Sequence, residues 1–335
     1  MLFWSVSARV IPESTALSFT LITEDPMNSL HVVTGAGPVG TTVALQLADA
    51  GHPVRLLTRS GSGPEHPLVE RRKVDVSRPE LLDEAFAGAV AVHHCIHGSA
   101  YTAAAWRAEL PEAERLVLEA AGRAGAVVVF PESLYAYGHV DGPMTEDSPR
   151  DADFGKPAVR VELLAARAAS PAPTVSVAAS DFFGPHVRNA HAGERMVPTV
   201  LAGKTVRVVG SLDQPHSWTY VPDLAAAMIR AAGTPELHNS FVHAPTNPPR
   251  TQREMVAAVA AAAGVAKPKV GVIPAGVIRA IGLVHGETRE LAEMSYQFTK
   301  PFVLDSTQSE ARLGLAPTPF DVAVKTTVDW WRHQA

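Results

Sequence analysis

Cysteine is almost absent from this sequence. Cys95 is the single cysteine among 335 residues, so no disulfide can form within it. That composition is typical of a reducing compartment, and we expect a cytoplasmic protein. A strong charge excess is missing too, because the net charge at pH 7 is −5. The charge therefore gives no reason to expect a nucleic-acid partner or an anionic membrane surface.

Long apolar runs are missing as well. The most apolar helical segment, residues 255–266, is rich in alanine and shorter than the roughly 20 residues of a membrane span. Residues 1–28 contain apolar side chains such as Trp4, but charged residues and a proline interrupt them, unlike the unbroken core of a signal peptide. We expect residues 1–28 to be a disordered extension, with Met27 as an alternative start site.

The hydrophobic residues, 46% of the chain, are arranged in short strands that alternate with amphipathic helices. This alternation predicts an α/β fold, a doubly wound parallel sheet of the Rossmann type, over residues 29–180. The predicted strands cover 29–34, 54–58, 70–76, 89–96, 126–130 and 174–178, and the predicted helices cover 39–50, 79–87, 104–121 and 158–169.

Beyond residue 180 the loops lengthen and helices dominate. Helices are predicted at 219–232, 252–263 and 320–333, with one short strand at 241–243. Residues 181–335 are therefore expected to form a smaller, mostly helical C-terminal substrate lobe, partly interleaved with the Rossmann domain.

A glycine-rich loop follows the first predicted strand and leads directly into a helix. Its spacing, Gly35-x-Gly37-x-x-Gly40, indicates a dinucleotide-binding site in this strand–loop–helix setting. Gly35 permits the tight turn, Gly37 lets the backbone approach a pyrophosphate, and Gly40 lets the helix pack against the strand. The free amides at the helix start favour the negative charge of the pyrophosphate. The predicted cofactor loop comprises Gly35, Ala36, Gly37, Pro38, Val39 and Gly40.

The end of the second predicted strand bears on the choice between NAD and NADP. An NAD-binding protein usually has an acidic residue there, whereas this chain has Thr58-Arg59-Ser60. Unless it is simply solvated, Arg59 can pair with a 2′-phosphate, so we expect NADP(H), with NAD(H) as the alternative. Asp75 and Val76 end the third predicted strand, beside the expected adenine site. Asp75 either accepts a hydrogen bond from the adenine amino group or caps the following turn.

Four motifs occur in an order that resembles the extended short-chain dehydrogenase/reductase family, the NAD-dependent epimerase/dehydratase group. They are the glycine loop at 34–40, Ser-Leu-Tyr-Ala-Tyr-Gly at 133–138, Asp-Phe-Phe-Gly-Pro at 181–185 and the segment 218–225. The resemblance extends over residues 29–335. It implies a Rossmann fold, a nicotinamide cofactor, a small-molecule substrate and a homodimer formed through the helices after the fourth and fifth strands.

The catalytic motif of this family, Tyr-x-x-x-Lys on the helix after the fifth strand, is altered here. Lys156 stands where the tyrosine should be, and Arg160 stands where the lysine should be. The resemblance implies that Arg160 still holds a ribose hydroxyl, but an arginine does not titrate near neutral pH. Lys156 can act as the proton donor only if burial or nearby positive charge lowers its pKa. The chain therefore resembles an atypical branch of the family.

Other polar residues are candidates for the missing acid. Ser133 matches the family serine that hydrogen-bonds the substrate oxygen. Tyr135 and Tyr137 follow the fifth predicted strand, at the sheet edge where ligands bind in such folds. Either phenol can replace the missing acid, or Tyr137 packs under the loop, as the family's tyrosine at this place often does. His94, near the end of the fourth predicted strand, is expected to touch the cofactor or the substrate.

The cluster of His93, Cys95 and His97 suggests a metal site at first sight, because alternate residues of a strand share one face. Three ligands on one extended strand rarely close around one zinc ion, and no second cluster supplies a fourth ligand. We therefore expect no metal site.

Three functions remain open from the sequence. The first is an NADP(H)-binding oxidoreductase or epimerase that moves a hydride between the nicotinamide and a carbonyl or alcohol held by Ser133, with a non-standard acid/base. The second is a non-catalytic NADP-sensing regulator or scaffold, which the loss of Tyr-x-x-x-Lys permits. The third is a redox-neutral lyase or dehydratase. Function depends on the site and not on the fold, so the geometry has to decide between them.

Overall fold

A seven-stranded parallel sheet forms the centre of the molecule. The computed structural model describes residues 29–283 and 286–334, and the extension predicted at 1–28 lies outside the described residues. The strands follow the order β10-β6-β5-β4-β1-β2-β3, and every neighbouring pair is parallel. Their bounds are β1 (Leu30–Thr34), β2 (Val54–Thr58), β3 (Val69–Lys73), β4 (Ala89–His94), β5 (Val127–Ser133), β6 (Thr174–Ala179) and β10 (Ser240–His243).

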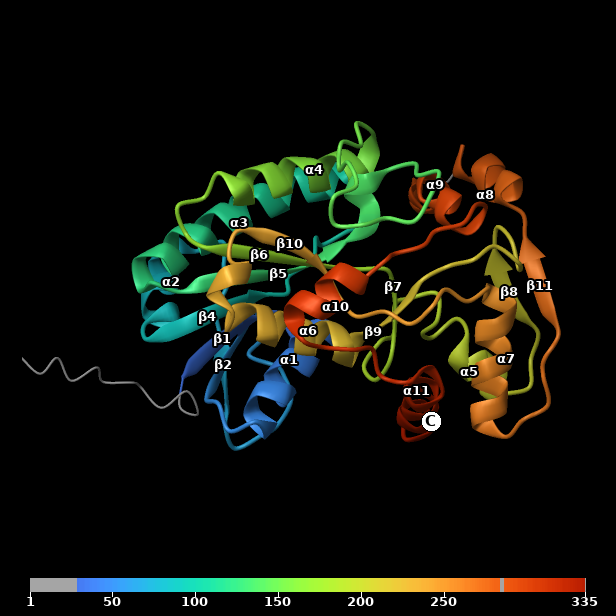
Figure 1. Ribbon diagram of the computed structural model, residues 1–335, viewed down its shortest axis with the longest axis horizontal. Helices are drawn as coiled ribbons and strands as arrows, with labels where there is room; N and C mark the ends of the chain where they lie inside the picture. The colour runs from blue at the N-terminus through green and yellow to red at the C-terminus, as the bar shows by residue number, and fades with distance from the viewer. Residues whose placement is uncertain (1–28, 284–285, 335) are drawn as a thin grey trace, which may run out of the picture.

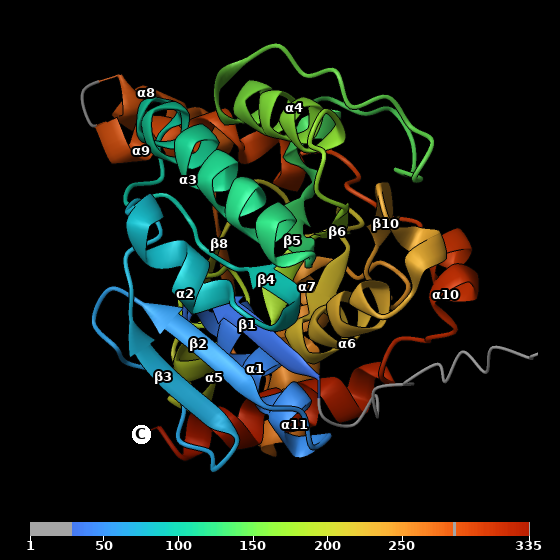
Figure 2. The same cartoon turned by 90° about the vertical axis from the view of Figure 1, so that its left-hand side faces the viewer.

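Helices cover both faces of this sheet, as the predicted doubly wound fold requires (Figures 1 and 2). On one face α1 and α6 pack together, and side chains such as Leu47 and Met228 share a buried cluster with Val33 of the sheet. On the other face α2 and α3 bury Phe86 and Val117, and α4 lies beside α3. The bounds are α1 (Pro38–Asp49), α2 (Leu82–Phe86), α3 (Ala103–Ala124), α4 (Gly155–Ala168) and α6 (Val221–Ala232), with short 3₁₀ helices η2 (Pro79–Leu81), η3 (Leu134–Tyr137) and η4 (Pro235–Leu237).

The other elements form a smaller lobe, on the right of Figure 1. It contains two small parallel sheets, β7 (Asp181–Phe183) with β9 (Trp218–Tyr220), and β8 (Val206–Val209) with β11 (Val270–Ile273). Helices α7 and α11 bury Met255, Val259 and Val328 in the core of this lobe. The helices of the lobe are α5 (Val197–Leu201), α7 (Gln252–Ala263), α8 (Ala275–Gly282), α9 (Gly286–Glu293) and α11 (Phe320–Arg332), with the short 3₁₀ helix η5 (Ser295–Phe298). The exception among the later elements is α10 (Thr307–Leu313), which packs against β10 and α6 of the central sheet.

The central sheet also contains a strand from beyond residue 180, where the Rossmann domain was predicted to end. Strand β10 pairs with β6 through residues 240–243, so it becomes the seventh strand of the central sheet. Helix α6, just before it, covers the sheet face beside α1. Residues 221–243 therefore belong to the sheet and its helical layer, although the segments before and after them belong to the lobe.

Two departures from the predicted elements affect the site. Helix α4 begins at Gly155, three residues before the predicted start, because Pro157 is tolerated in a first turn where no amide bond is needed. Lys156 is therefore in this first turn, with Arg160 one turn later. The prediction of a helix at 219–232 was wrong at its start, since Thr219 lies in strand β9 and the helix begins at 221 with a proline in its first turn.

Other predicted elements are confirmed to the residue. Strand 54–58 and helix 252–263 have the predicted bounds, and Thr251 and Glu254 form the expected capping box. Within residues 29–283 and 286–334, no helix combines the length and the apolar character that a membrane span requires.

Candidate functional site

The glycine loop joins β1 to α1 in the middle of the sheet. Gly35 has a φ of 89°, and a Cβ there would lie 2.9 Å from the carbonyl oxygen of Cys95. A Cβ at Gly40 would overlap the Gly35 carbonyl oxygen, so only glycine permits this close approach of helix and loop. Gly37 differs from both, because apart from the adjoining backbone no atom of a described residue lies within 4 Å of the position of its missing Cβ. The bare backbone of Gly37 therefore borders open space.

The first turn of α1 is suited to an anion. Gly37 caps the helix without a side-chain hydrogen bond, Pro38 lies in the first turn, and that turn contains no acidic residue. The unpaired amides and the helix dipole are thus available to a pyrophosphate. Ala36 and Pro38 are half-buried, and the buried Val39 anchors the turn in the core.

The predicted 2′-phosphate region lies after β2 and β3. Arg59 is exposed and forms no hydrogen bond or ion pair with a described residue, so its guanidinium is available to a ligand. Asp75 accepts hydrogen bonds on Oδ1 from the Ser77 amide (3.0 Å) and hydroxyl (2.8 Å), and these bonds lower the pKa of its carboxyl. Of the two predicted roles of Asp75, the structure shows the turn cap. The side chain of Val76 is buried, which leaves only its backbone to face a cofactor.

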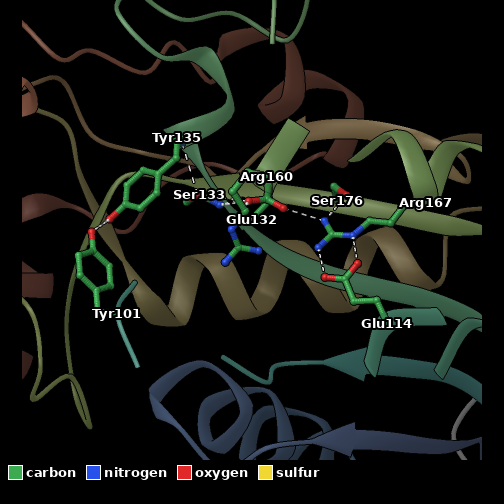
Figure 3. A network of polar contacts seen from close by, with 8 residues as sticks. All are labelled: Tyr101, Glu114, Glu132, Ser133, Tyr135, Arg160, Arg167 and Ser176. Atoms are coloured by element: carbon green, nitrogen blue, oxygen red, sulfur yellow. Dashed lines mark hydrogen bonds and ion pairs between the residues drawn. The ribbon is translucent and has the colours of Figure 1, made fainter. Parts of the chain in front are cut away.

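Two tyrosines meet beyond the end of β5. Ser133 ends this strand, and its Oγ accepts a hydrogen bond from the Tyr135 amide (3.4 Å). The Tyr135 hydroxyl lies 2.6 Å from the Tyr101 hydroxyl, and Trp106 stacks on the Tyr135 ring with centroids 6.1 Å apart (Figure 3). Burial raises the pKa of Tyr135 well above its usual value, with smaller effects from Tyr101 and Asp181. The raised pKa keeps the Tyr135 phenol protonated at neutral pH and makes it a weaker acid than a free tyrosine, so it can give its proton only to a strongly basic oxygen such as an alkoxide.

Tyr101 was missed by the sequence analysis. It lies in the loop between β4 and α3, where no motif marks it. Burial raises the pKa of its phenol as well. Only the folded chain shows that this hydroxyl and that of Tyr135 form one hydrogen-bonded pair.

Tyr137 points away from this pair. Its hydroxyl donates to the Thr145 carbonyl oxygen (2.8 Å) and lies 2.7 Å from Nε2 of His243. The side chain is buried, and burial raises the pKa of the phenol to about 12. This geometry corresponds to the second predicted role of Tyr137, which is packing under the following loop.

Lys156 is completely buried at the start of α4. Its Nζ lies 2.6 Å from Glu290 Oε2 and 3.1 Å from Glu293 Oε1, both on α9, and 4.6 Å from the centre of the Tyr101 ring. The proton-donor hypothesis named burial or a nearby positive charge as its condition. Lys156 is buried, but the charged groups that contact its Nζ are the two carboxylates of Glu290 and Glu293. Lys156 therefore ties α9 of the lobe to α4, and Tyr135 is the stronger candidate for the acid.

Arg160 lies one turn further along α4, next to Ser133. Its Nε is 3.4 Å from Glu132 Oε1, and its guanidinium lies 4.8 Å from the centre of the Trp106 ring (Figure 3). Burial alone would raise the pKa of Glu132, but the positive charges of Arg160 and Arg167 more than offset this effect, and the pKa is lowered. Glu132 is therefore an anion between two arginines.

The histidines at the end of β4 form no metal site. Nδ1 of His94 is 2.8 Å from Thr34 Oγ1, whereas its buried Nε2 has no hydrogen-bond partner in the described part of the chain. Burial lowers the pKa of His94 to about 3, so the ring is neutral. His93 instead lies against His31, with ring nitrogens 3.3 Å apart. The described residues contain no group of three or more His, Cys, Asp or Glu side chains that could hold a metal ion.

A histidine–aspartate pair borders the same edge of the sheet. Nε2 of His216 is 2.7 Å from Asp181 Oδ2, and Nδ1 is 3.1 Å from the carbonyl oxygen of Gln297. Asp181 is two residues beyond Ala179, which pairs in register with Ser133. Burial would raise the pKa of Asp181, but the hydrogen bond and the charge of His216 lower it overall. This acid–base pair was not predicted, because it depends on the pairing of β7 with β9.

Comparisons with known proteins agree with this architecture. The model of the NAD dependent epimerase/dehydratase family matches residues 31–242. A search of curated proteins gave no match.

Three similar solved structures illustrate the fold. Bordetella bronchiseptica WbmH, in complex with NAD+, has a TM-score of 0.72 at 17% identity, covering 91% of this chain and 98% of that one. The UDP-glucose 4-epimerase of Thermotoga maritima, with UDP-glucose, has a TM-score of 0.70 at 18% identity, with 91% and 99% coverage. The DesIV double mutant, a dTDP-glucose 4,6-dehydratase of Streptomyces venezuelae, has a TM-score of 0.71 at 18% identity, with 90% and 96% coverage. At these identities the likeness shows the fold.

Proposed function

Since the chain belongs to the NAD dependent epimerase/dehydratase family, we propose that it is a nicotinamide-dinucleotide oxidoreductase or epimerase that acts on a carbonyl or alcohol of a small molecule. The observation that carries this proposal is the open space at Gly37, at the start of α1. From β1 the chain proceeds to β2 and β3 on one side and to β4 on the other. Ligands of doubly wound sheets bind at such a switch point, outside the carboxyl ends of the strands.

NADP(H) is the proposed cofactor, with NAD(H) as the alternative. Exposed Arg59 follows β2, at the position where a carboxylate would otherwise select for the free ribose hydroxyls. A guanidinium that forms no hydrogen bond with a described residue can form two hydrogen bonds to a 2′-phosphate. The glycine loop would hold the pyrophosphate, and Arg160 would hold the ribose next to the nicotinamide.

The proposed chemistry uses the hydroxyl groups beyond β5. When bound, the dinucleotide supplies a hydride to the substrate carbon or removes one from it. The Ser133 hydroxyl donates to Glu132 Oε1 (3.2 Å). In the reducing direction it would turn this hydrogen bond to the substrate carbonyl oxygen. Tyr135 gives its proton to the same oxygen, and Tyr101, 2.6 Å away, can replace that proton. The proton that the tyrosine pair gives up would then return from solvent.

Nucleotide sugars are the first substrates to test. The similar structures were solved with UDP-glucose or carry the name of a dTDP-glucose 4,6-dehydratase. A sugar hydroxyl that is oxidised to a ketone and reduced again is an alcohol–carbonyl pair of the kind that Ser133 and Tyr135 can serve. We therefore propose a sugar nucleotide, or another small polyol, as the substrate class.

The experiment has a binding part and a turnover part. The purified full chain is titrated with NADPH and NADH by fluorescence, and then incubated with sugar nucleotides, aldehydes and ketones. Absorbance at 340 nm detects net redox change, and NMR of the products detects epimerisation, which leaves the cofactor unchanged. Tyr135→Phe should bind the dinucleotide as the wild type does but turn over about 10²- to 10⁴-fold more slowly.

The outcomes separate the candidate functions. Binding with turnover supports the proposal. Binding without turnover of any substrate would favour the regulator or scaffold. No binding of either dinucleotide would overturn the cofactor site and with it the proposed function.

A further inference from the structure

Four charged side chains form a buried chain between α3, α4 and β5. Arg167 donates to both oxygens of Glu114 (2.6 and 2.7 Å) and to Glu132 Oε2 (2.7 Å), and Glu132 Oε1 faces Arg160 Nε at 3.4 Å. Each of the four residues is at most 8% exposed. Figure 3 shows them in one line that ends at Ser133.

Stability alone does not account for this arrangement. Removing four charges from water is costly, and apolar residues of similar size often stabilise a fold as well or better. At the Glu114–Arg167 end nearly every hydrogen-bonding group has a partner, since Arg167 also donates to Ser176 Oγ (3.0 Å). The Arg160 end still has free hydrogen-bond donors, because Nε of Arg160 is buried without a hydrogen-bond partner in the described residues. Its two terminal nitrogens have no bond with a described residue either.

Glu132 connects Arg160 to the substrate-binding serine. The same oxygen, Oε1, that faces Arg160 also accepts a hydrogen bond from the Ser133 amide (2.7 Å). Glu132 is 1% exposed, so it cannot contact a ligand itself. In Figure 3 the Arg160 guanidinium lies on the Ser133 side of Glu132, away from the Arg167–Glu114 pair.

We infer that Glu132 is a positioning residue that holds Arg160 ready for the ribose next to the nicotinamide. This inference rests on the proposed function, which assigns Arg160 to that ribose. The Glu132 carboxylate lies 3.4 Å from Nε, and the guanidinium lies 4.8 Å from the centre of the Trp106 ring. The two terminal nitrogens, which have no bond with a described residue, can act as paired donors for a vicinal diol. Arg167 balances the second oxygen of Glu132 and keeps it ionised. A long side chain that is fixed before the ligand arrives loses less conformational freedom on binding.

The test uses three ligands that differ by one part each. ADP lacks the second ribose, ADP-ribose contains it, and NADH adds the nicotinamide. Calorimetric titration of the full chain should show that Glu132→Gln weakens ADP-ribose and NADH about three- to tenfold while ADP binds as to the wild type. Arg160→Ala should have the same pattern, and the double variant should bind ADP-ribose no more weakly than Arg160→Ala alone.

Two further variants keep the test decisive. Glu132→Asp retains the buried charge but shortens the reach to Arg160, so it should fold even if Glu132→Gln does not, and should lower the affinity for ADP-ribose relative to ADP. Glu114→Gln is the matched control, since it removes a charge from the far end of the same chain. It should lower the melting temperature and leave the ratio of ADP-ribose to ADP affinity unchanged.

The possible failures are distinguishable. If the Glu132 variants weaken ADP and ADP-ribose equally, or if the effects of Glu132→Gln and Arg160→Ala add, Glu132 has only a structural role and the inference is wrong. If the wild type binds ADP-ribose and NADH but Arg160→Ala does not weaken them, the inference is also wrong while the cofactor site stands. A wild type that binds neither these three ligands nor NADPH overturns both the inference and the proposed function.

Discussion

Two glycines of one loop, Gly37 and Gly40, should respond to the same added methyl group in different ways. Gly37 has φ −70° and ψ −175°, which alanine also adopts, and open space surrounds the position of its missing Cβ. Alanine stabilises by about 0.4–1 kcal/mol through the unfolded chain, and it costs a similar amount at a helix N-cap. We therefore expect Gly37→Ala to change the free energy of unfolding by less than about 1 kcal/mol, or the melting temperature by less than about 4 °C.

The effect of Gly37→Ala on binding should be much larger. The methyl group would occupy the space through which the pyrophosphate approaches the backbone amides. Loss of one hydrogen bond to a charged group costs about 1.5–3 kcal/mol, which corresponds to about 10- to 100-fold weaker dinucleotide binding. Gly40→Ala should instead lower the stability clearly. Its methyl group meets the Gly35 carbonyl oxygen, and overpacking costs about 1–3 kcal/mol of stability.

Thermal unfolding and fluorescence titration with NADPH measure the two effects on the same samples. Gly142→Ala is the matched control, since open space also surrounds this glycine and it lies outside the loop. It should change neither quantity. Wild-type affinity in Gly37→Ala would refute the reasoning, because no ligand phosphate then approaches this backbone. A loss of stability in Gly37→Ala as large as in Gly40→Ala would refute it as well.

Three other predictions concern the cofactor choice, acid stability and a helix cap. Arg59→Asp should shift the preference from NADPH toward NADH by at least about tenfold, since it replaces the partner of a 2′-phosphate by a repelling charge; an unchanged ratio in competitive titrations would contradict the NADP assignment. Burial lowers the pKa of His31 from 6.5 to about 4, and that of His93 well below 6.5, so the native state keeps both rings neutral while the unfolded chain binds protons below pH 6.5. The free energy of unfolding in urea should therefore fall between pH 6.5 and 4 by up to about 1.4 kcal/mol per pH unit for each histidine, and a flat profile would be incompatible with neutral buried rings. Thr251→Ala removes the side chain that caps α7 and should cost about 1 kcal/mol, or roughly 2–4 °C in melting temperature, whereas an unchanged melting temperature would mean that the capping box adds no stability.

The parts of this protein that could be predicted depend on local sequence. The glycine loop is one example, because the strand, the turn and the helix are contiguous and each glycine has its own steric reason. The capping box at Thr251 and Glu254 is another, since both partners lie within one turn. Even the altered motif at Lys156 and Arg160 was visible as an absence of the expected residue types.

The parts that could not be predicted depend on contacts between distant segments. The surroundings of Lys156 come from Glu290 and Glu293, more than 130 residues later, and no local pattern links them. The pairing of His216 with Asp181 requires the parallel register of β7 and β9. Such contacts also distinguish the three predicted candidates for the acid. Lys156 pairs with two carboxylates, Tyr137 bonds to Thr145 and His243, and Tyr135 pairs with Tyr101.

The position of β10 in the central sheet has a consequence for truncated versions of this chain. A fragment that stops near residue 180 would lack β10 and leave β6 as a bare outer strand, although all six residues of β6 are buried in the whole protein. Exposed, apolar edge strands tend to pair with strands of other chains. Such a fragment should therefore aggregate instead of folding as an independent nucleotide-binding domain. We therefore expect the two halves to unfold together, and exchange of the lobe between relatives would have to carry residues 221–243 along with the sheet.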